Sequence, residues 1–245
     1  MHKPLIFFSF LGLMAFACSL GATPSATATP EPAEPVASVP PVASATASPV
    51  LFRDDFEGSL AVGWQWLHED PTHWSLTATP GHLRIIVQPS SVNEERVRNF
   101  LVRPAPDGNF EIGTLLRFTP TSNFQFAGLL IYQAQGNAMQ FGRAFAQCGS
   151  AYCVGNAIYF DSYQAFKFDP TNFATQVDNP SVAYLRLSRE GTNYTAYYSS
   201  DGNNWNTIGQ HTSSITPTYV GLIAAQAQPQ EVPADFDYFT IKAMP

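Results

Sequence analysis

The chain has 245 residues and a formal net charge of −7, and only 13% of its residues are charged while another 13% are aromatic. Its few Lys and Arg residues form no cluster along the sequence, so the basic patch with which nucleic-acid-binding proteins neutralise phosphates is missing, and we expect no nucleic-acid partner. Beyond a beginning that has no side chains for a core, the length suits one domain of ordinary size.

The first 18 residues are typical of a targeting segment. Lys3 provides a positive start, residues 5–16 are apolar, and small residues follow. Ala15, Ala17 and Cys18 resemble a bacterial lipoprotein cleavage box, although Ala15 replaces the usual Leu. The resemblance implies that the signal is removed, that Cys18 is lipid-modified, and that the exported protein is anchored to the membrane or cell surface. The alternative is an ordinary secretory signal that is cut nearby, with Cys18 lost.

Residues 19–49 consist mainly of Ala, Pro, Thr, Ser and Val. Such a composition offers no side chains with which to build a core, and prolines favour extended conformers. We therefore expect a disordered stalk that holds the domain of residues 50–245 away from the anchor.

From residue 50 onward, the sequence consists of short runs with the period of strands, and no helical stripe of useful length interrupts them. Turn residues such as Pro106-Asp107-Gly108 separate the runs. Many short strands with regular turns indicate a sandwich or barrel. The expected strands cover residues 51–56, 74–78, 82–88, 99–103, 110–118, 124–133, 138–146, 157–168, 218–227 and 235–242, together with three strands in residues 181–209.

Residues 181–209 predict an antiparallel meander, because Leu185 and Leu187 alternate with polar residues and Asp201-Gly202 provides a turn. The stretch YLRLSREGTNYTAYYSSDGNNW resembles the meander of the concanavalin A-like domain found at the C-terminus of family 43 β-xylosidases and in related bacterial proteins. The agreement includes FQFAGLLIYQAQGNAMQFGR upstream, and VGLIAA and ADFDYFTI downstream. It implies an all-β fold, a concanavalin A-like jelly-roll sandwich of two antiparallel sheets.

Two of the three cysteines, Cys148 and Cys153, lie in the run CGSAYC. In an exported protein, two cysteines at a loop favour a small disulfide over a zinc site, because zinc would need two further ligands. The alternative is a pair of free thiols.

The sequence contains no E-x-D-x-x-E or E-x-D-x-E run, no H-E-x-x-H and no G-x-S-x-G motif. An enzyme hypothesis, a cryptic glycoside hydrolase, therefore needs carboxylates from separate strands to converge. The candidates are Glu69, Asp70, Asp161 and Asp169. The alternative is that they are surface carboxylates.

Sugar-binding modules stack apolar sugar faces on aromatic rings and hydrogen-bond the hydroxyls with polar side chains. From strand position we expect Trp66, Tyr132 and Tyr159 to face a ligand, with Gln133 and Arg143 as hydrogen-bonding partners. For any single aromatic residue, the alternative is a place in the core of the sandwich.

Acidic residues gather at the two ends of the domain, namely Asp54, Asp55, Asp235 and Asp237. If the first and last strands pair, these carboxylates come together, and Ca²⁺ would relieve their repulsion. The resemblance supports a structural calcium, because many relatives carry one near these ends. The alternative is that the first and last of these residues cap turns or pair with neighbouring Arg53 or Lys242.

Together these features predict a non-catalytic, cell-surface carbohydrate-binding module that recognises a polysaccharide. In the resembling β-xylosidases, the domain accompanies a catalytic propeller, which we do not find in this sequence. A structural or adhesive module that binds protein is the first alternative, and a concave face filled with bulky side chains would favour it. A glycoside hydrolase is the second.

Overall fold

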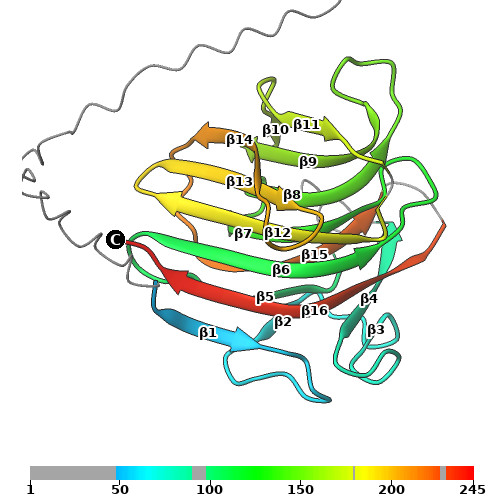
Figure 1. Ribbon diagram of the computed structural model, residues 1–245, viewed down its shortest axis with the longest axis vertical. Coiled ribbons are helices and arrows are strands. Elements are labelled where there is room, and N and C mark those ends of the chain that lie inside the picture. Colours follow the sequence, from blue (N-terminus) through cyan, green and yellow to red (C-terminus); the bar gives the residue numbers. More distant parts are fainter. Residues whose placement is uncertain (1–47, 90–97, 179, 227–229) are drawn as a thin grey trace, which may run out of the picture. The chain divides into compact units, whose positions relative to one another are not determined.

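The alternating sequence runs fold as strands in the computed structural model, which describes residues 48–89, 98–178, 180–226 and 230–245. The predicted signal, Cys18 and nearly all of the predicted stalk lie outside these residues. No helix in the described part of the chain is long and apolar enough to cross a membrane. The strands form two antiparallel sheets packed face to face, as predicted (Figure 1).

The first sheet crosses the front of Figure 1. β1 pairs with the C-terminal part of β16 and β4 with its N-terminal part, while β3 lies beside β4. On the other side of β16 the order is β6, β12, β13 and β14. The bounds are β1 (Val50–Asp54), β3 (Trp74–Ser75), β4 (Leu83–Pro89), β6 (Phe110–Phe118), β12 (Val182–Glu190), β13 (Asn193–Ser199), β14 (Asn206–Thr212) and β16 (Val232–Ala243).

The second sheet has the order β2, β5, β15, β7, β8 and β9, and both β10 and β11 pair with β9. A short parallel pairing between β4 and β15 joins the two sheets at one edge. The bounds are β2 (Gln65–Leu67), β5 (Phe100–Pro104), β7 (Phe126–Ala134), β8 (Asn137–Ala146), β9 (Gly155–Gln164), β10 (Lys167–Phe168), β11 (Phe173–Gln176) and β15 (Tyr219–Gln226).

The main core lies between the sheets, where Leu185 and Leu187 of the meander pack with residues of the second sheet such as Leu129 and Phe141. Leu130, between Leu129 and Ile131, belongs instead to a second apolar cluster on the outer face of the second sheet. β7 is therefore apolar on both faces because it is a central strand with a cluster on each side, as the sequence predicts.

One predicted strand is divided. Residues 157–168 form β9 and β10, joined by a tight turn in which Ala165 and Phe166 have φ angles of 49° and 63°. Left-handed backbone is unfavourable for such residues, so neither of them marks a turn in the sequence. β2 and β11 also form strands that the sequence did not predict.

Candidate functional site

A row of aromatic side chains crosses one end of the second sheet. Tyr219, Tyr132, Ala138, Tyr163 and Phe168 lie directly opposite one another on successive strands, from β15 to β10. Directly paired residues project from the same face of a sheet, and here that face carries the second apolar cluster, so it points away from the main core. Neighbouring strands are about 4.8 Å apart, so this aromatic row is about 19 Å long.

Ala138 lies in the middle of the aromatic row and is only 1% exposed, so neighbouring side chains cover it. Tyr132 and Tyr163 flank it from strands that are two steps apart, or about 10 Å. Tyr132, Tyr163 and Tyr219 are partly buried against the second apolar cluster, and Phe168 is 44% exposed. The rings therefore rest on an apolar floor and keep part of their surface accessible.

The next row on the same face is polar, because Gln140 of β8 lies opposite Asp161 of β9. Gln140 Nε2 donates to Asp161 Oδ2 at 2.8 Å, and the Tyr152 hydroxyl donates to Asp161 Oδ1. Asp161 is only 6% exposed, and burial raises the pKa of its carboxyl to about 6 although both donors favour the charged form.

Tyr152 comes from the connection between β8 and β9, where Cys148 and Cys153 form a disulfide bond. Its ring lies edge-to-face on Tyr159 and Phe168, with centroids 5.2 Å away in each case. The disulfide-closed loop thus lies over the polar row and connects it to the end of the aromatic row. Burial raises the pKa of the Tyr152 hydroxyl well above its usual range, so it remains a donor.

Of the five residues expected to bind a ligand, only Tyr132 lies in the aromatic row. Tyr159 lies on the same face, but it is 2% exposed and its hydroxyl donates to the Gly155 carbonyl. Gln133 is exposed at the end of β7, where its side-chain oxygen accepts from the Thr216 amide.

The other two expected residues lie elsewhere. Trp66 packs on Trp74 with ring centroids 4.9 Å apart, against the main core. Arg143 is fully buried and alternates with Met139 and Phe141, which places it between the sheets. The prediction that Arg143 faces a ligand beside Tyr132 is therefore wrong, because the odd-numbered positions of β8 point inward.

Tyr163, Phe168 and Tyr219 were not predicted as site residues. The spacing of Tyr159 and Tyr163 places both on one face of β9, and this is a signal that the sequence contains. The alignment of Tyr163 with Tyr132 depends on the register of the consecutive strands β7, β8 and β9, whereas Tyr219 joins the row from the distant strand β15.

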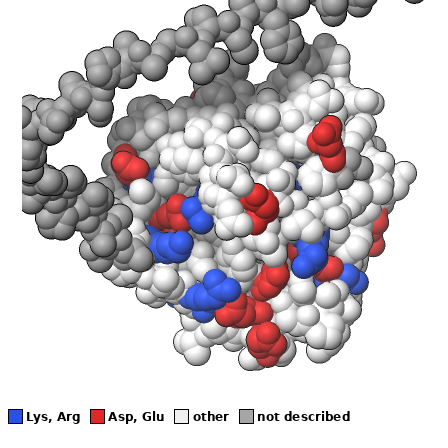
Figure 2. All heavy atoms as spheres, viewed as in Figure 1, with Lys and Arg blue, Asp and Glu red and all other residues white. Residues whose placement is uncertain are grey.

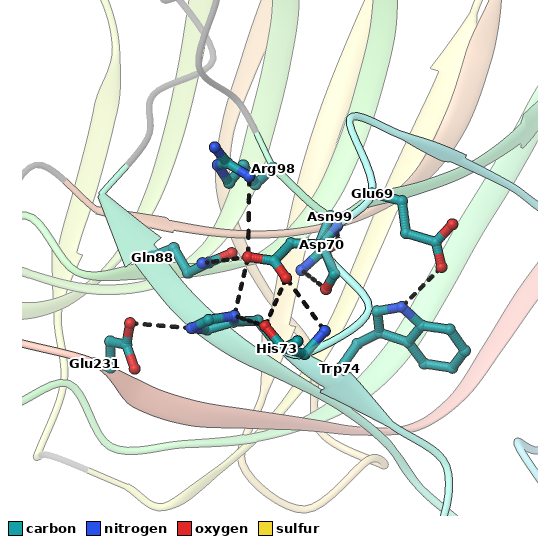
Figure 3. Close-up of polar contacts among 9 residues, drawn as sticks. Glu69, Asp70, His73, Trp74, Gln88, Arg98, Asn99 and Glu231 are labelled. Carbon is teal, nitrogen blue, oxygen red and sulfur yellow. Dashed lines mark hydrogen bonds and ion pairs between the residues drawn. The ribbon is translucent and has the colours of Figure 1, made fainter.

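Two of the candidate catalytic carboxylates, Glu69 and Asp70, lie in a polar cluster between β2 and β3 (Figure 3). The Glu69 carboxylate accepts from the indole of Trp74 at 3.0 Å. Asp70 accepts from the backbone and hydroxyl of Thr72 and from Gln88 Nε2, and these donors lower the pKa of its carboxyl.

His73 joins this cluster to the start of β16 (Figure 3). Its Nδ1 lies 3.0 Å from Asp70 Oδ2 and its Nε2 lies 3.1 Å from Glu231 Oε1. The cluster thus connects distant segments of the chain.

The other two candidate acids lie elsewhere. Asp161 lies under Tyr152, and Asp169 accepts from the amide and hydroxyl of Thr171. Each candidate acid has its own protein partners, and these contacts show no pair arranged for catalysis.

The first and last strands pair as predicted, but the register places Asp54 opposite Phe239. The Asp54 carboxylate accepts from the amides of Phe56 and Ala61 and from the Trp64 indole. The remaining expected ligands are arranged separately: Asp55 pairs with Arg53, Asp235 binds Arg84 through both oxygens, and Asp237 lies at the irregularity of β16 between Phe236 and Tyr238.

These contacts do not fit one calcium site, because the oxygens of Asp54 are occupied by three N–H donors and those of Asp235 by Arg84. Among the described residues, no three His, Cys, Asp or Glu side chains are grouped to hold a metal ion. Calcium binding by this chain therefore stays a prediction of the sequence, which melting with and without a chelator would test.

The outer face of the first sheet carries charged side chains. Acidic and basic side chains are interspersed on the face shown in Figure 2. Arg186 and Lys242 both lie within 4 Å of Glu111, at 3.8 and 3.7 Å, and the Arg186 guanidinium also lies 3.7 Å from the ring centroid of Trp205. Exposed pairs of this kind are common on protein surfaces and contribute little to stability.

Comparison with known proteins identifies the family and agrees with the fold. Residues 53–242 match the family model described as the β-xylosidase C-terminal concanavalin A-like domain. A β-xylosidase of Bacillus subtilis (strain 168) is 27% identical in an alignment 207 residues long that covers 77% of this chain and 38% of that protein.

Two solved structures share the fold. The family 43 protein BlXynB from Bacillus licheniformis superposes with a TM-score of 0.71 at 22% identity, over 78% of this chain and 39% of that chain. The xylan β-1,4-xylosidase from Bacillus halodurans C-125 superposes with a TM-score of 0.68 at 23% identity, over the same shares of the two chains. The chain therefore spans less than half the length of these relatives.

Proposed function

The chain belongs to the family of β-xylosidase C-terminal concanavalin A-like domains, and from this premise we propose that it is a non-catalytic carbohydrate-binding module for a polysaccharide. The relatives named as β-xylosidases are longer proteins of which this chain matches 38% or 39%. Their activity is therefore not transferred to it, whereas a polymeric sugar ligand is consistent with their names.

The aromatic row is the observation that carries the proposal. Tyr132, Tyr163 and Phe168 project from one face, as stacking against the apolar faces of sugars requires. The row is about 19 Å long, which suits several linked sugar units rather than one. Gln140 and Asp161 in the next row are only 8% and 6% exposed and are hydrogen-bonded to each other, so the rings provide the contact surface.

The carboxylates support a binding role rather than hydrolysis. Glycosidases need two carboxyl groups on either side of the scissile bond, roughly 5 to 9.5 Å apart. The hydrogen-bond partners of Asp161 among the described residues are the neutral side chains of Gln140 and Tyr152. Glu69 and Asp70 are held in the separate cluster of Figure 3.

The anchored location belongs to the same proposal and rests on the sequence. A lipid on Cys18 would hold the module at the membrane or cell surface, with residues 19–49 as a stalk. Full-length protein and the Cys18→Ser variant would be compared by detergent phase partitioning and by incorporation of a labelled fatty acid. We expect only the unmodified sequence to take up label, and label in the Ser variant would contradict lipidation of Cys18.

The test of function uses protein from residue 19 onward, with insoluble polysaccharide pull-down and a reducing-sugar assay on the same samples. The panel includes arabinoxylan, xyloglucan, glucomannan and cellulose. We expect retention on at least one polysaccharide without release of reducing sugar. Sugar release would instead support the hydrolase alternative.

A protein-binding structural module remains the competing function, and one observation favours it. Behind the aromatic row, the outer face of the second sheet is filled by bulky side chains, since Phe100, Leu130 and Ile223 are almost fully buried there. A long glycan would therefore contact the row and not the whole face. Absence of binding to every polysaccharide in the panel would support this alternative.

A further inference from the structure

Asp161 is the acidic group closest in register to the middle of the aromatic row. It lies two residues from Tyr163 along β9, and its partner Gln140 lies two residues from Ala138 along β8. Residues two apart in a strand project from the same face, about 7 Å from each other. A sugar unit stacked on the exposed part of Tyr163 would therefore lie within range of the carboxylate.

Within the described part of the chain, the side chains that face Asp161 are neutral. Gln140 faces it from β8, Tyr152 faces it from the disulfide-closed loop, and Tyr163 lies beside it on β9. The ring of Phe168 from β10 packs on the rings of Tyr152 and Tyr163, at centroid distances of 5.2 and 5.4 Å, respectively. A carboxylate in such surroundings is poorly screened, so its repulsion of other anions extends further than in water.

The turn that leads to Phe168 is strained. Ala165 and Phe166 both have left-handed φ angles, and Ala165 N and Phe166 N donate to Asn137 Oδ1 and the Gly136 carbonyl of the neighbouring turn. Strained backbone that the surrounding contacts hold in place tends to occur at functional sites. Here it places Phe168 opposite Tyr163, at the end of the row beside Asp161.

From this arrangement we propose that Asp161 makes the site selective for uncharged sugar units, so that glycans carrying uronate groups at this position are rejected. The inference rests on the proposed function and adds the chemical class of the ligand. A neutral sugar unit on the aromatic row has no charge for Asp161 to repel, whereas a sugar carboxylate meets a like charge.

The selectivity depends on pH, because the burial that makes Asp161 effective also raises its pKa to about 6. At pH 7.5 the group is charged and rejects anions. At pH 5 it is mostly protonated, while uronates remain charged, so the discrimination weakens. Tyr152, Tyr159 and Tyr163 face the same space, but their pKa values are raised and they stay neutral throughout this range.

The test is affinity electrophoresis of the protein from residue 19 onward in gels that contain neutral arabinoxylan, xyloglucan or glucomannan, or acidic glucuronoxylan or polygalacturonate. Wild type, Asp161→Asn and, as a control distant from the row, Asp201→Asn are compared at pH 7.5 and pH 5. For wild type at pH 7.5 we expect the best neutral glycan to bind about tenfold more tightly than the acidic ones. We expect this preference for neutral glycans to be largely lost in Asp161→Asn at pH 7.5, and also in wild type at pH 5. In Asp201→Asn at pH 7.5 the preference should be the same as in wild type.

The outcomes separate this inference from the proposed function. Binding to an acidic glycan as tight as to the best neutral glycan at pH 7.5, or an unchanged ratio in Asp161→Asn, overturns charge selection and leaves carbohydrate binding in place. Binding to no glycan by any variant overturns the proposed function itself. Thermal unfolding of each variant shows whether a loss of binding reflects a loss of fold.

Discussion

At the scale of single residues, the buried carboxylate of Asp161 destabilises the folded state when it is charged. Burial raises its pKa from 3.8 to about 6, so the native protein binds this proton more tightly than the unfolded chain does. The contribution of Asp161 to the free energy of unfolding is most favourable below pH 4. It is lost as the pH rises through about 6, and the free energy of unfolding falls by about 3 kcal/mol in total.

We therefore expect Asp161→Asn to flatten this part of the stability profile. Urea unfolding at several pH values between 4 and 7.5 measures the difference in unfolding free energy between the variant and wild type. That difference should shift in favour of the variant as the pH rises. A constant difference across this range would show that Asp161 does not titrate there.

Asp70 has the opposite character. Donors from Thr72 and Gln88 lower the pKa of its carboxyl, so its charged form stabilises the fold. This contribution is present above the unfolded value of 3.8 and is lost as the pH falls through the lower native value. Asp70→Asn should therefore lower the melting temperature at pH 7, with a gap to wild type that narrows below pH 4; a gap that stays the same size down to pH 2.5 would contradict this.

At the scale of elements, the loop between β8 and β9 is held by two devices, the bond between Cys148 and Cys153 and the packing of Tyr152. Closing a loop this short reduces the entropy of the unfolded chain by an amount worth about 2 kcal/mol. The loop also covers Asp161, so its stability bears on the polar row.

The double variant Cys148→Ser/Cys153→Ser should be about 2 kcal/mol less stable than oxidised wild type in urea unfolding. Dithiothreitol should lower the stability of wild type by a similar amount and leave the variant unchanged. Equal stability of the oxidised protein and the double variant would show that Tyr152 packing alone holds the loop.

The strands themselves were largely predictable, because period-two alternation and turn residues are local signals. β12 and β13 follow the alternation of Leu185, Leu187 and Tyr194. The turn at Ala165 and Phe166 was not predictable, because neither residue favours left-handed backbone and contacts from Gly136 and Asn137 impose it. β2 consists of Gln65–Leu67, too short for a period to be recognised.

At the scale of the whole molecule, the site depends on the register between strands. Tyr132 was predicted from its strand position, but its alignment with Tyr163 follows from the register of β7, β8 and β9, and its alignment with Tyr219 follows from the pairing of β7 with the distant strand β15. The inward direction of Arg143 could have been predicted, since Met139 and Phe141 share its face of β8 and the intervening positions are polar or small. The carboxylates at the chain ends were expected to meet. In the structure Asp54 and Asp235 are held by separate protein donors, while Asp55 and Asp237 both lie close enough to Arg53 to raise its pKa.

The central claim is that the aromatic row on the second sheet binds polysaccharide. The direct measurement is the affinity of the protein from residue 19 onward for its best polysaccharide, compared between Tyr132→Ala/Tyr163→Ala and a control pair, Tyr184→Ala/Tyr197→Ala, on the first sheet. Two lost stacking contacts predict a loss of about tenfold or more for the row pair and little change for the control pair, with both still folded by circular dichroism. Unchanged affinity of the row pair, or a larger loss in the control pair, would contradict the account.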